Sequence, residues 1–284
     1  MARRPDFTPK TRAQIAYYMQ LKRRFRRPAP TGPAATGGTE TVINPEPGRF
    51  FRVHTFLTGG TLSVNSEITT AEYLLIGGGG PGGAATFGSG GGGSAGDVIA
   101  QQITLAVDTY AISVGEGGVC VSSESATKGG DTTAFDLTAR GGGVGGSRDL
   151  APNDGGGGAD FRNPTGAAHP TSFTGGDGTV GEENDERAGG GGRGAAGDGE
   201  DATLLKGGDG GAAIISDISG ASVAYGRGGG GGRRGGAAGD PNGGGPAKAG
   251  GGAGLNPGDG GGGAASTASV MLGGPGGDGI AIIR

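Results

Sequence analysis

The sequence reads GGGGRGAAGDG at residues 189–199 and GRGGGGGRRGGAAG at residues 226–239. Both runs belong to a glycine-rich stretch, residues 141–279, in which 52 residues are glycine. Such material supplies few side chains for a hydrophobic core. The stretch is therefore either unfolded or held together by a packing of backbone against backbone that only glycine permits.

A glycine chain can adopt the polyproline-II backbone, a left-handed threefold helix without internal hydrogen bonds. Every N–H and C=O then needs a partner on a neighbouring segment. Each such bond contributes only about 0.5–1.5 kcal/mol net, so many helices must form together to offset the chain entropy. The alternative is a flexible linker, but linkers are usually rich in both Gly and Ser, whereas here the glycines stand in blocks separated by loop-like inserts. We therefore predict a packed polyglycine-II helix bundle over residues 141–284.

Upstream of this glycine-rich stretch the amino-acid composition is different, with more aliphatic and aromatic residues. Leu, Ile, Val and Phe number 46 in the whole chain, a low share for a globular protein, and 25 of them lie between Val42 and Leu137. Short β-branched and aromatic runs bounded by Gly or Asp turns predict a small antiparallel β-sandwich over residues 49–140. The expected strands are 49–57, 61–64, 71–76, 97–105, 109–114 and 132–139, with a further strand or hairpin at 212–225 and a closing strand at 279–284.

Charge is concentrated at the N-terminus. Residues 1–27 carry nine Lys or Arg and one Asp, a net charge of +8, and the remainder carries −12. Helix-forming residues at 12–25 predict a short anchoring helix that docks into a larger assembly; a disordered basic tail is the alternative reading. Residues 28–48, rich in Pro, Gly and Thr, are interpreted as a linker. The expected docking residues are Ile15, Tyr18, Met19, Arg23, Arg24 and Phe25.

Several functional classes find no support in the sequence. The single cysteine, Cys120, excludes an intrachain disulfide and argues against a metal cluster. With two histidines in the chain, no nucleophile, base and orienting group are expected to converge, so we expect neither an enzyme nor a cofactor. No run approaches the length of a membrane span, and no secretory signal is recognisable, which predicts synthesis in a cytoplasm. Nucleic-acid binding by the body is not expected, and the interrupted glycine register excludes collagen.

Five motifs follow one another in a recognisable order. They are FRVHTFLTGGTLSV (51–64), AEYLLIGGGGPGG (71–83), TYAISVGEGG (109–118), GGDTTAFDLTARGGG (129–143) and GGPGGDGIAIIR (273–284). This series resembles the glycine-rich domain of tail-fibre and adhesin proteins of tailed bacteriophages. The resemblance covers about residues 50–284; the polar insert 147–188 departs from it.

The resemblance implies a virion protein, made in the host cytoplasm, that attaches to other virion proteins through residues 1–27. It further implies that loops at one tip of a rigid glycine-rich body bind a host receptor, either a glycan or an outer-membrane protein. Fibres of this kind are often homotrimers, so a homotrimer is the default expectation. The candidate receptor-contact residues are the aromatic side chains expected to be exposed on loops: Phe161, His169, Phe173 and Tyr225.

Two other functions compete with the adhesin reading. The first is a capsid decoration or head-fibre protein, located on the head rather than the tail, without receptor specificity of its own. The second is a fibre-borne depolymerase, which the lack of a recognisable pair of catalytic carboxylates disfavours.

Overall fold

A computed structural model gives the fold of the chain. The structure describes residues 33–46, 48–85, 88–123, 125–147, 173, 175, 179–180, 187–233, 251–266 and 269–284. Within these ranges the regular elements are all β-strands. They are β1 (Ala35–Thr36), β2 (Thr39–Glu46), β3 (Arg49–Phe56), β4 (Gly60–Val64), β5 (Ile68–Ile76), β6 (Val98–Leu105), β7 (Thr109–Ile112), β8 (Thr132–Ala134), β9 (Leu137–Ala139), β10 (Thr179–Val180), β11 (Arg187–Ala188), β12 (Ile214–Ser216), β13 (Val223–Tyr225) and β14 (Ile280–Ile283).

The largest sheet has five strands in the order β2-β3-β14-β5-β6. Its central strand is the last one in the chain: β14 pairs antiparallel with β3 on one side and with β5 on the other. All four residues of β14 are buried, because both faces of the sheet are covered at this position. The predicted closing strand and the predicted antiparallel sheets are thus confirmed. The single strand predicted at 132–139 is corrected: it is a hairpin of β8 and β9, because Phe135 and Asp136 form a turn with positive φ between them.

A three-stranded antiparallel sheet, β1-β4-β7, packs on one face of the five-stranded sheet. Alternate residues of β3, β4 and β5 supply the core between the two sheets, which is the pattern of strands with one inward face. Phe56, Leu62, Tyr73 and Leu75 lie in this core, and the edge-to-face contact of Tyr110 with Phe135 closes it.

A hairpin of β12 and β13 covers the second face of the five-stranded sheet. Val53, Leu74 and Ile282 contribute from the sheet, and Tyr225 contributes from the hairpin. Gly220 has a φ of +92° and lies against the side chain of Ile43, where a Cβ would overlap it. The sequence therefore needs glycine at the hairpin turn to bring the hairpin onto the sheet.

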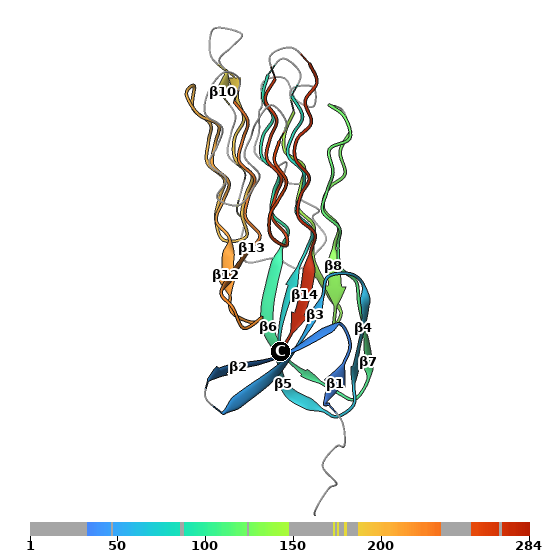
Figure 1. The fold of residues 1–284 in the computed structure, drawn as a ribbon. Coiled ribbons are helices and arrows are strands. Elements are labelled where there is room, and N and C mark those ends of the chain that lie inside the picture. The colour runs from blue at the N-terminus through green and yellow to red at the C-terminus, as the bar shows by residue number, and fades with distance from the viewer. Residues whose placement is uncertain are drawn as a thin grey trace, which may run out of the picture.

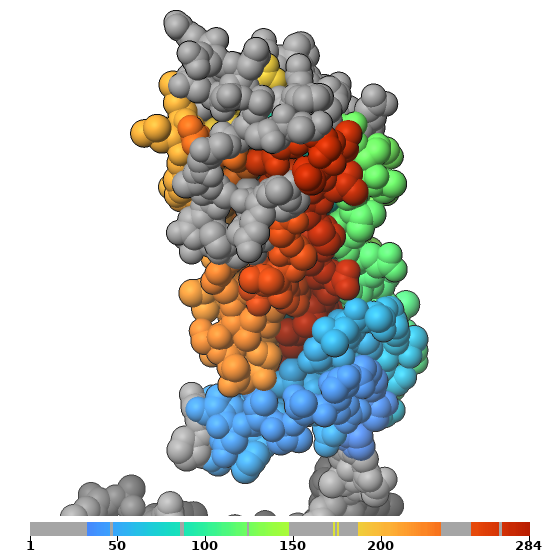
Figure 2. Space-filling view, turned by 45° about the horizontal axis from the view of Figure 1, so that its top comes forward, coloured from blue at the N-terminus to red at the C-terminus, as the bar shows by residue number. Residues whose placement is uncertain are grey.

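Beyond the sheets, glycine segments run side by side away from the strand ends, as Figure 1 shows. The chain leaves β5 through residues 77–85, returns to β6 through 88–97, and repeats such excursions until 269–279 leads into β14. Figure 2 shows the same arrangement in space-filling form, with the blue sheet residues at one end and the orange and red glycine segments extending from them.

Each interior glycine segment is hydrogen-bonded to several others in different directions. The segment 77–83 shows this most clearly, because consecutive amides donate to three separate segments. These bonds, of 2.8–2.9 Å, run from Gly78 to Gly130, from Gly79 to Gly277, and from Gly80 to Ser94. The same direction recurs at every third residue: Gly77 and Gly83 donate, like Gly80, to carbonyls in the range 91–97. The backbone N–H groups of this segment are thus hydrogen-bonded to several neighbouring segments. In an ordinary β-ladder they would be bonded to a single partner strand.

At many interior glycine positions this packing leaves no room for a side chain. A Cβ added to Gly79 would overlap the carbonyl oxygen of Asp259, and one added to Gly82 would overlap that of Gly262. Glycine is therefore required at these positions by the approach of backbone to backbone.

The helical part of the predicted fold class is corrected by the structure. The described residues contain no helix, so the predicted polyglycine-II helix bundle is corrected, and they give no support to the anchoring helix. The glycine blocks are extended segments whose amides donate to other segments, and they prolong a mainly β fold with antiparallel sheets. The predicted N-terminal helix over 12–25 lies outside the described residues.

Two strands fall within residues 28–48, which we interpreted as a linker. β1 pairs with β4, and β2 pairs with β3 along most of its length. The physical reason is that the run from Thr39 to Ile43, which is rich in β-branched residues, forms an edge strand once β3 is present to pair with it.

Candidate functional site

The glycine segments reverse direction at the end of the molecule far from the sheets, which we call the distal end. Its described part is held together by antiparallel bridges between segments that are distant in sequence. The bridged pairs are Ala85 with Met271, Ser89 with Ala265, and Ala188 with Arg233. The short pair β10 and β11 lies at this end as well (Figure 1). In the described part of the chain, the distal end therefore brings together segments that are far apart in sequence.

One described connection at the distal end presents two leucines to solvent. Thr203 and Lys206 close a tight turn, with the Thr203 amide donating to the Lys206 carbonyl at 2.8 Å. Leu204 and Leu205 occupy the two central positions, and the Leu205 side chain is 79% exposed. The Arg233 Nε donates to the Leu204 carbonyl at 2.7 Å and fixes the turn to the adjacent segment. An exposed Leu–Leu pair on a fixed turn is a candidate contact point, because solvent-exposed apolar groups gathered together commonly mark interaction sites.

Further aliphatic side chains are exposed on two neighbouring segments. Val270 and Leu272 lie on the segment that leads to β14, and Val119 and Val121 lie on the segment that follows β7. These segments are hydrogen-bonded to each other through the Gly276 amide and the Gly118 carbonyl, among other bonds. The described surface of the glycine body thus offers aliphatic contacts on a rigid backbone frame.

Among the described residues of the glycine body, the carboxylate of Asp259 is fully buried in the interior. Burial raises the pKa of this carboxyl, although hydrogen bonds partly oppose the shift. Oδ1 accepts from the Arg227 amide at 2.8 Å, and Oδ2 accepts from the Asn256 amide at 3.0 Å and from its side-chain amide at 3.1 Å. The carboxylate therefore holds the turn at 256–258 against the neighbouring segment, and its role is structural.

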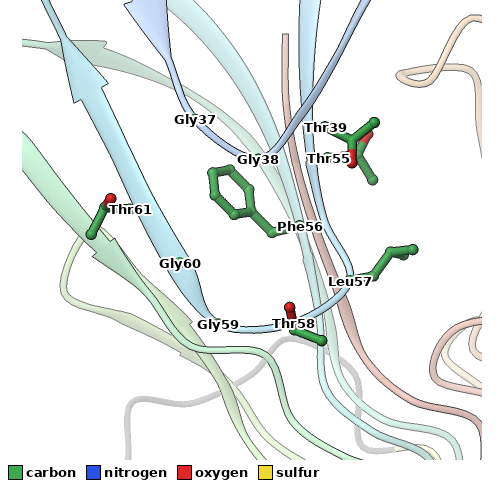
Figure 3. Close-up of a pocket in the computed structure, with 10 residues that line it drawn as sticks. All are labelled: Gly37, Gly38, Thr39, Thr55, Phe56, Leu57, Thr58, Gly59, Gly60 and Thr61. Atoms are coloured by element: carbon green, nitrogen blue, oxygen red, sulfur yellow. The ribbon is translucent and has the colours of Figure 1, made fainter.

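A hollow of about 400 Å³ lies at the edge of the sheets, where the β3–β4 turn passes the chain between β1 and β2 (Figure 3). The buried ring of Phe56 lies beside Gly38 and Gly60, and a Cβ on either glycine would crowd the ring. Leu57, which follows Phe56, is 63% exposed. The lining is completed by backbone and by threonine side chains: Gly37, Thr39, Thr55, Thr58, Gly59 and Thr61.

A second hollow, of about 350 Å³, lies on the other side of Leu57. It is lined by the turn that carries the exposed Leu255 and by the segment around Asp278. Asp278 Oδ1 accepts from the Gly117 amide at 2.8 Å. Leu57 thus forms a ridge between two hollows at the junction of the sheets and the glycine body.

His54 has a structural environment, as its position in a strand predicts. Its ring is buried, and Nδ1 lies 2.9 Å from the Gly37 carbonyl. Nearby, the hydrogen bond from Arg52 lowers the pKa of the Glu40 carboxyl. The described residues include no group of three or more His, Cys, Asp or Glu side chains that would hold a metal ion.

The candidate receptor-contact residues are not brought together in the described structure. Phe161 and His169 lie outside the described residues, and Phe173 is half-buried. Tyr225 lies on β13 with its side chain only 3% exposed, so the expectation that it is an exposed aromatic is corrected. Its ring packs into the core under the hairpin, and burial raises the pKa of its hydroxyl.

The candidate docking residues all precede the described part of the chain. These are Ile15, Tyr18, Met19, Arg23, Arg24 and Phe25. The described chain begins at Pro33, whose carbonyl accepts from the Asn65 side chain at 3.2 Å, at the sheet end of the molecule. In the described ranges no helix is long and apolar enough to cross a membrane.

Sequence reasoning did not single out Leu204, Leu205, Leu57 or Leu255. A signal was present in the first pair, because two adjacent leucines stand between glycine blocks where no strand or helix pattern surrounds them. No local signal marks Leu57 and Leu255, since the hollows beside Leu57 exist only after distant segments pack together.

A family model described as a glycine-rich domain matches residues 55–284. The match covers most of the chain, and the chain therefore belongs to this glycine-rich domain family. No curated protein shows a significant match to the sequence.

Proposed function

We propose that this member of the glycine-rich domain family is a phage virion fibre protein, either a tail fibre or a tip adhesin. In this proposal residues 1–27 attach to other virion proteins, and the distal end contacts a receptor on the host cell surface. The receptor is a glycan or an outer-membrane protein, and the protein is made in the host cytoplasm before it joins the particle.

The observation that carries the proposal is that the described part of the molecule has two different ends, the sheet end and the distal end. Pro33 enters at the sheet end, whereas the described bridges between distant glycine segments lie at the opposite end. A basic N-terminal stretch is thus joined to one end of an elongated body, and the surface with exposed Leu204 and Leu205 lies at the other. Surface loops on a rigid scaffold are a common location for binding residues.

The glycine body suits a spacer that must hold its loops in place. Its segments are joined by direct backbone hydrogen bonds of about 2.8–3.0 Å in several directions. Such a frame orders the loop ends before binding, which lowers the entropy lost when a partner is bound.

Competition for host cells tests this function. Purified full-length protein, added to host cells before the particles, is expected to reduce particle adsorption in a concentration-dependent way. Protein that saturates the cell suspension without changing the adsorption rate would contradict the adhesin function. Particles that lack residues 1–27 of this protein are expected to lose it from the virion, whichever end contacts the host.

A capsid decoration or head-fibre function is the second candidate. It is favoured by the burial of Tyr225, which removes one of the four aromatic side chains expected at the receptor. Such a protein would be found on the head, and excess free protein would leave adsorption unchanged.

A further inference from the structure

The two edge strands of the five-stranded sheet differ in how they are protected from pairing with another chain. β2, at one edge, contains Glu40 and Pro45 and changes register against β3 in its last part. Charges, proline and bulges are features that keep an edge strand from pairing further. β6, at the other edge, has the sequence VIAQQITL, without charge, proline or glycine. β6 is therefore an edge that can accept a further strand.

The middle of β6 is accessible to such a strand. The side chains of Ala100, Gln101 and Gln102 are exposed, whereas Val98 and Leu105 at the two ends of the strand are buried. Val98 belongs to the core under the β12–β13 hairpin, so the hairpin covers the start of β6 and leaves its middle uncovered.

Hydrogen bonds on β5 show which backbone groups of β6 point away from the sheet. Glu72 exchanges two backbone hydrogen bonds of 2.8 Å with Arg284, so its amide and carbonyl point towards β14. This direction alternates along a strand, so the next residue, Tyr73, points towards β6, where Gln101 lies opposite. The amide and carbonyl of Gln101 therefore point back to β5. Those of its two neighbours in β6 point outward, where no described strand pairs with them.

The pattern of β6 is complementary to itself. Residues directly opposite each other in an antiparallel pair lie on the same face of the sheet. A two-fold axis through Gln101 places Ala100 opposite Gln102 of a second copy, so that outward backbone groups meet outward backbone groups. The same axis places Ile99 opposite Ile103 of the second copy, and both are only partly buried against the main core. An axis through Gln102 would instead place the polar Gln101 opposite Ile103.

We propose that β6 pairs antiparallel with β6 of a second copy of this chain, about a two-fold axis at Gln101. The two five-stranded sheets then form one continuous sheet across both copies. Because each copy contributes the same surface, the contact is isologous and closes as a pair. The inference rests on the described residues alone and does not depend on the proposed function.

Charge does not oppose this pairing. Like charges directly opposite each other destabilise a strand pair, and β6 carries none. Asp97, just before β6, forms an ion pair with Arg193 at 3.0 Å. Glu72, on the adjacent strand β5, accepts from Arg284 Nε at 2.8 Å. The two carboxylates beside the contact are thus compensated within each copy.

Backbone hydrogen bonds supply most of the expected affinity, as they do where a strand is added to a sheet edge. The outward groups of Ala100 and Gln102 in the two copies make about four such bonds. Ile99 and Ile103 add apolar contact on one face of the extended sheet. The interface is small, so we expect the fraction of paired chains to depend on protein concentration.

The experiment measures the molar mass of the full-length protein in solution over a range of concentrations, for the wild type, Q101K and Q101E. Gln101 lies opposite itself across the axis, so either variant alone places two like charges face to face. An equal mixture of the two variants places opposite charges there. The matched control is T41K, because Thr41 is exposed on the other edge strand, β2.

Circular dichroism and thermal unfolding establish that each variant is folded. A100P blocks the edge in a second way and replaces a charge variant that does not fold. The Ala100 amide points outward, so proline at this position removes a bond to the second copy and none to β5.

The wild type and T41K are expected to form a species of two chains with equal affinity. Q101K and Q101E are each expected to associate at least about tenfold more weakly, and their mixture is expected to restore the pair. A wild type that stays a single chain at every concentration, or forms a larger assembly, overturns the proposal. Unchanged association in Q101K, or a mixture that associates no better than either variant alone, also overturns it.

Discussion

The amide of Gly93 donates to the carbonyl of Gly261 at 2.8 Å, although the two residues are far apart in sequence. The carbonyl of Gly93 accepts in turn from the Gly229 amide at 2.9 Å. One glycine thus joins three segments at the centre of the body, and its position is fixed in two directions. The stability of the body therefore depends on the absence of side chains at such crossing points.

Alanine at Gly229 is expected to destabilise the protein. A Cβ at this position would overlap the Gly261 carbonyl oxygen, and the Gly229 amide cannot move away without losing its bond to Gly93. Because several segments would have to shift together, we expect G229A to lower the free energy of unfolding by about 3 kcal/mol or more. Chemical denaturation of the full-length protein measures the loss.

The matched control for this substitution is G197A. The nearest atoms to a Cβ at Gly197 belong to Ala212 and lie 3.5 Å away, which is an ordinary contact. G197A is therefore expected to leave stability nearly unchanged. Equal losses in G229A and G197A would show that close packing at the crossing points is not what makes glycine necessary.

Removing the Arg284 side chain is expected to loosen the closing strand. Its Nε donates to Glu72 Oε2 at 2.8 Å, and its guanidinium lies 5.5 Å from the centre of the Phe51 ring. We expect R284M to lower the free energy of unfolding by about 1–2 kcal/mol, since the contact is largely shielded by the protein. R52M removes a more exposed ion pair and is expected to change stability little; a larger loss in R52M than in R284M would contradict this ranking.

The buried carboxyl of Asp259 is expected to give stability a distinct pH dependence. Burial raises its pKa in the folded protein, so the folded state holds the proton more tightly than the unfolded state. The contribution of this group is therefore fully present below the ordinary carboxyl pKa and is lost as the pH rises through the raised value. Unfolding free energies measured across mildly acidic pH are expected to show this component in the wild type and not in D259N. Parallel pH profiles for the two proteins would contradict the assignment.

Polar residues in place of Leu204 and Leu205 are expected to weaken competition for host cells. The two side chains project from a turn fixed by Arg233, so L204S with L205S changes the surface without removing core contacts. The variant is expected to need at least about tenfold more protein than the wild type to block adsorption, which corresponds to roughly 1.4 kcal/mol of binding free energy. V107S, at the sheet end, is the control; an equal effect of both variants would count against a distal contact.

The antiparallel strands could be predicted because alternation and glycine turns are local signals. The strand predicted at 49–57 and the closing strand at 279–284 correspond to β3 and β14. The placement of β14 between β3 and β5 could not be predicted, since it depends on the return of the chain through the whole glycine body. β2 was missed because its threonines and Pro45 resemble a linker until β3 provides a partner.

The candidate site was less predictable than the strands. The prediction that Tyr225 is exposed was wrong. The β12–β13 hairpin covers the second face of the five-stranded sheet and buries Tyr225 there, and the sequence does not show that this face needs a cover. The prediction of helices in the glycine body was wrong because composition suggests a repeating backbone but does not determine its secondary structure. The contact roles of Phe161, His169 and Phe173 stay predictions.

The orientation of the protein on the particle tests the central claim most directly. Electron cryomicroscopy of intact virions can distinguish the sheet end, where Pro33 enters, from the distal end that carries Leu205. The account predicts that the sheet end faces the particle and that the distal end points outward from a tail fibre. A distal end directed into the particle, or virions that do not contain the protein, would contradict it.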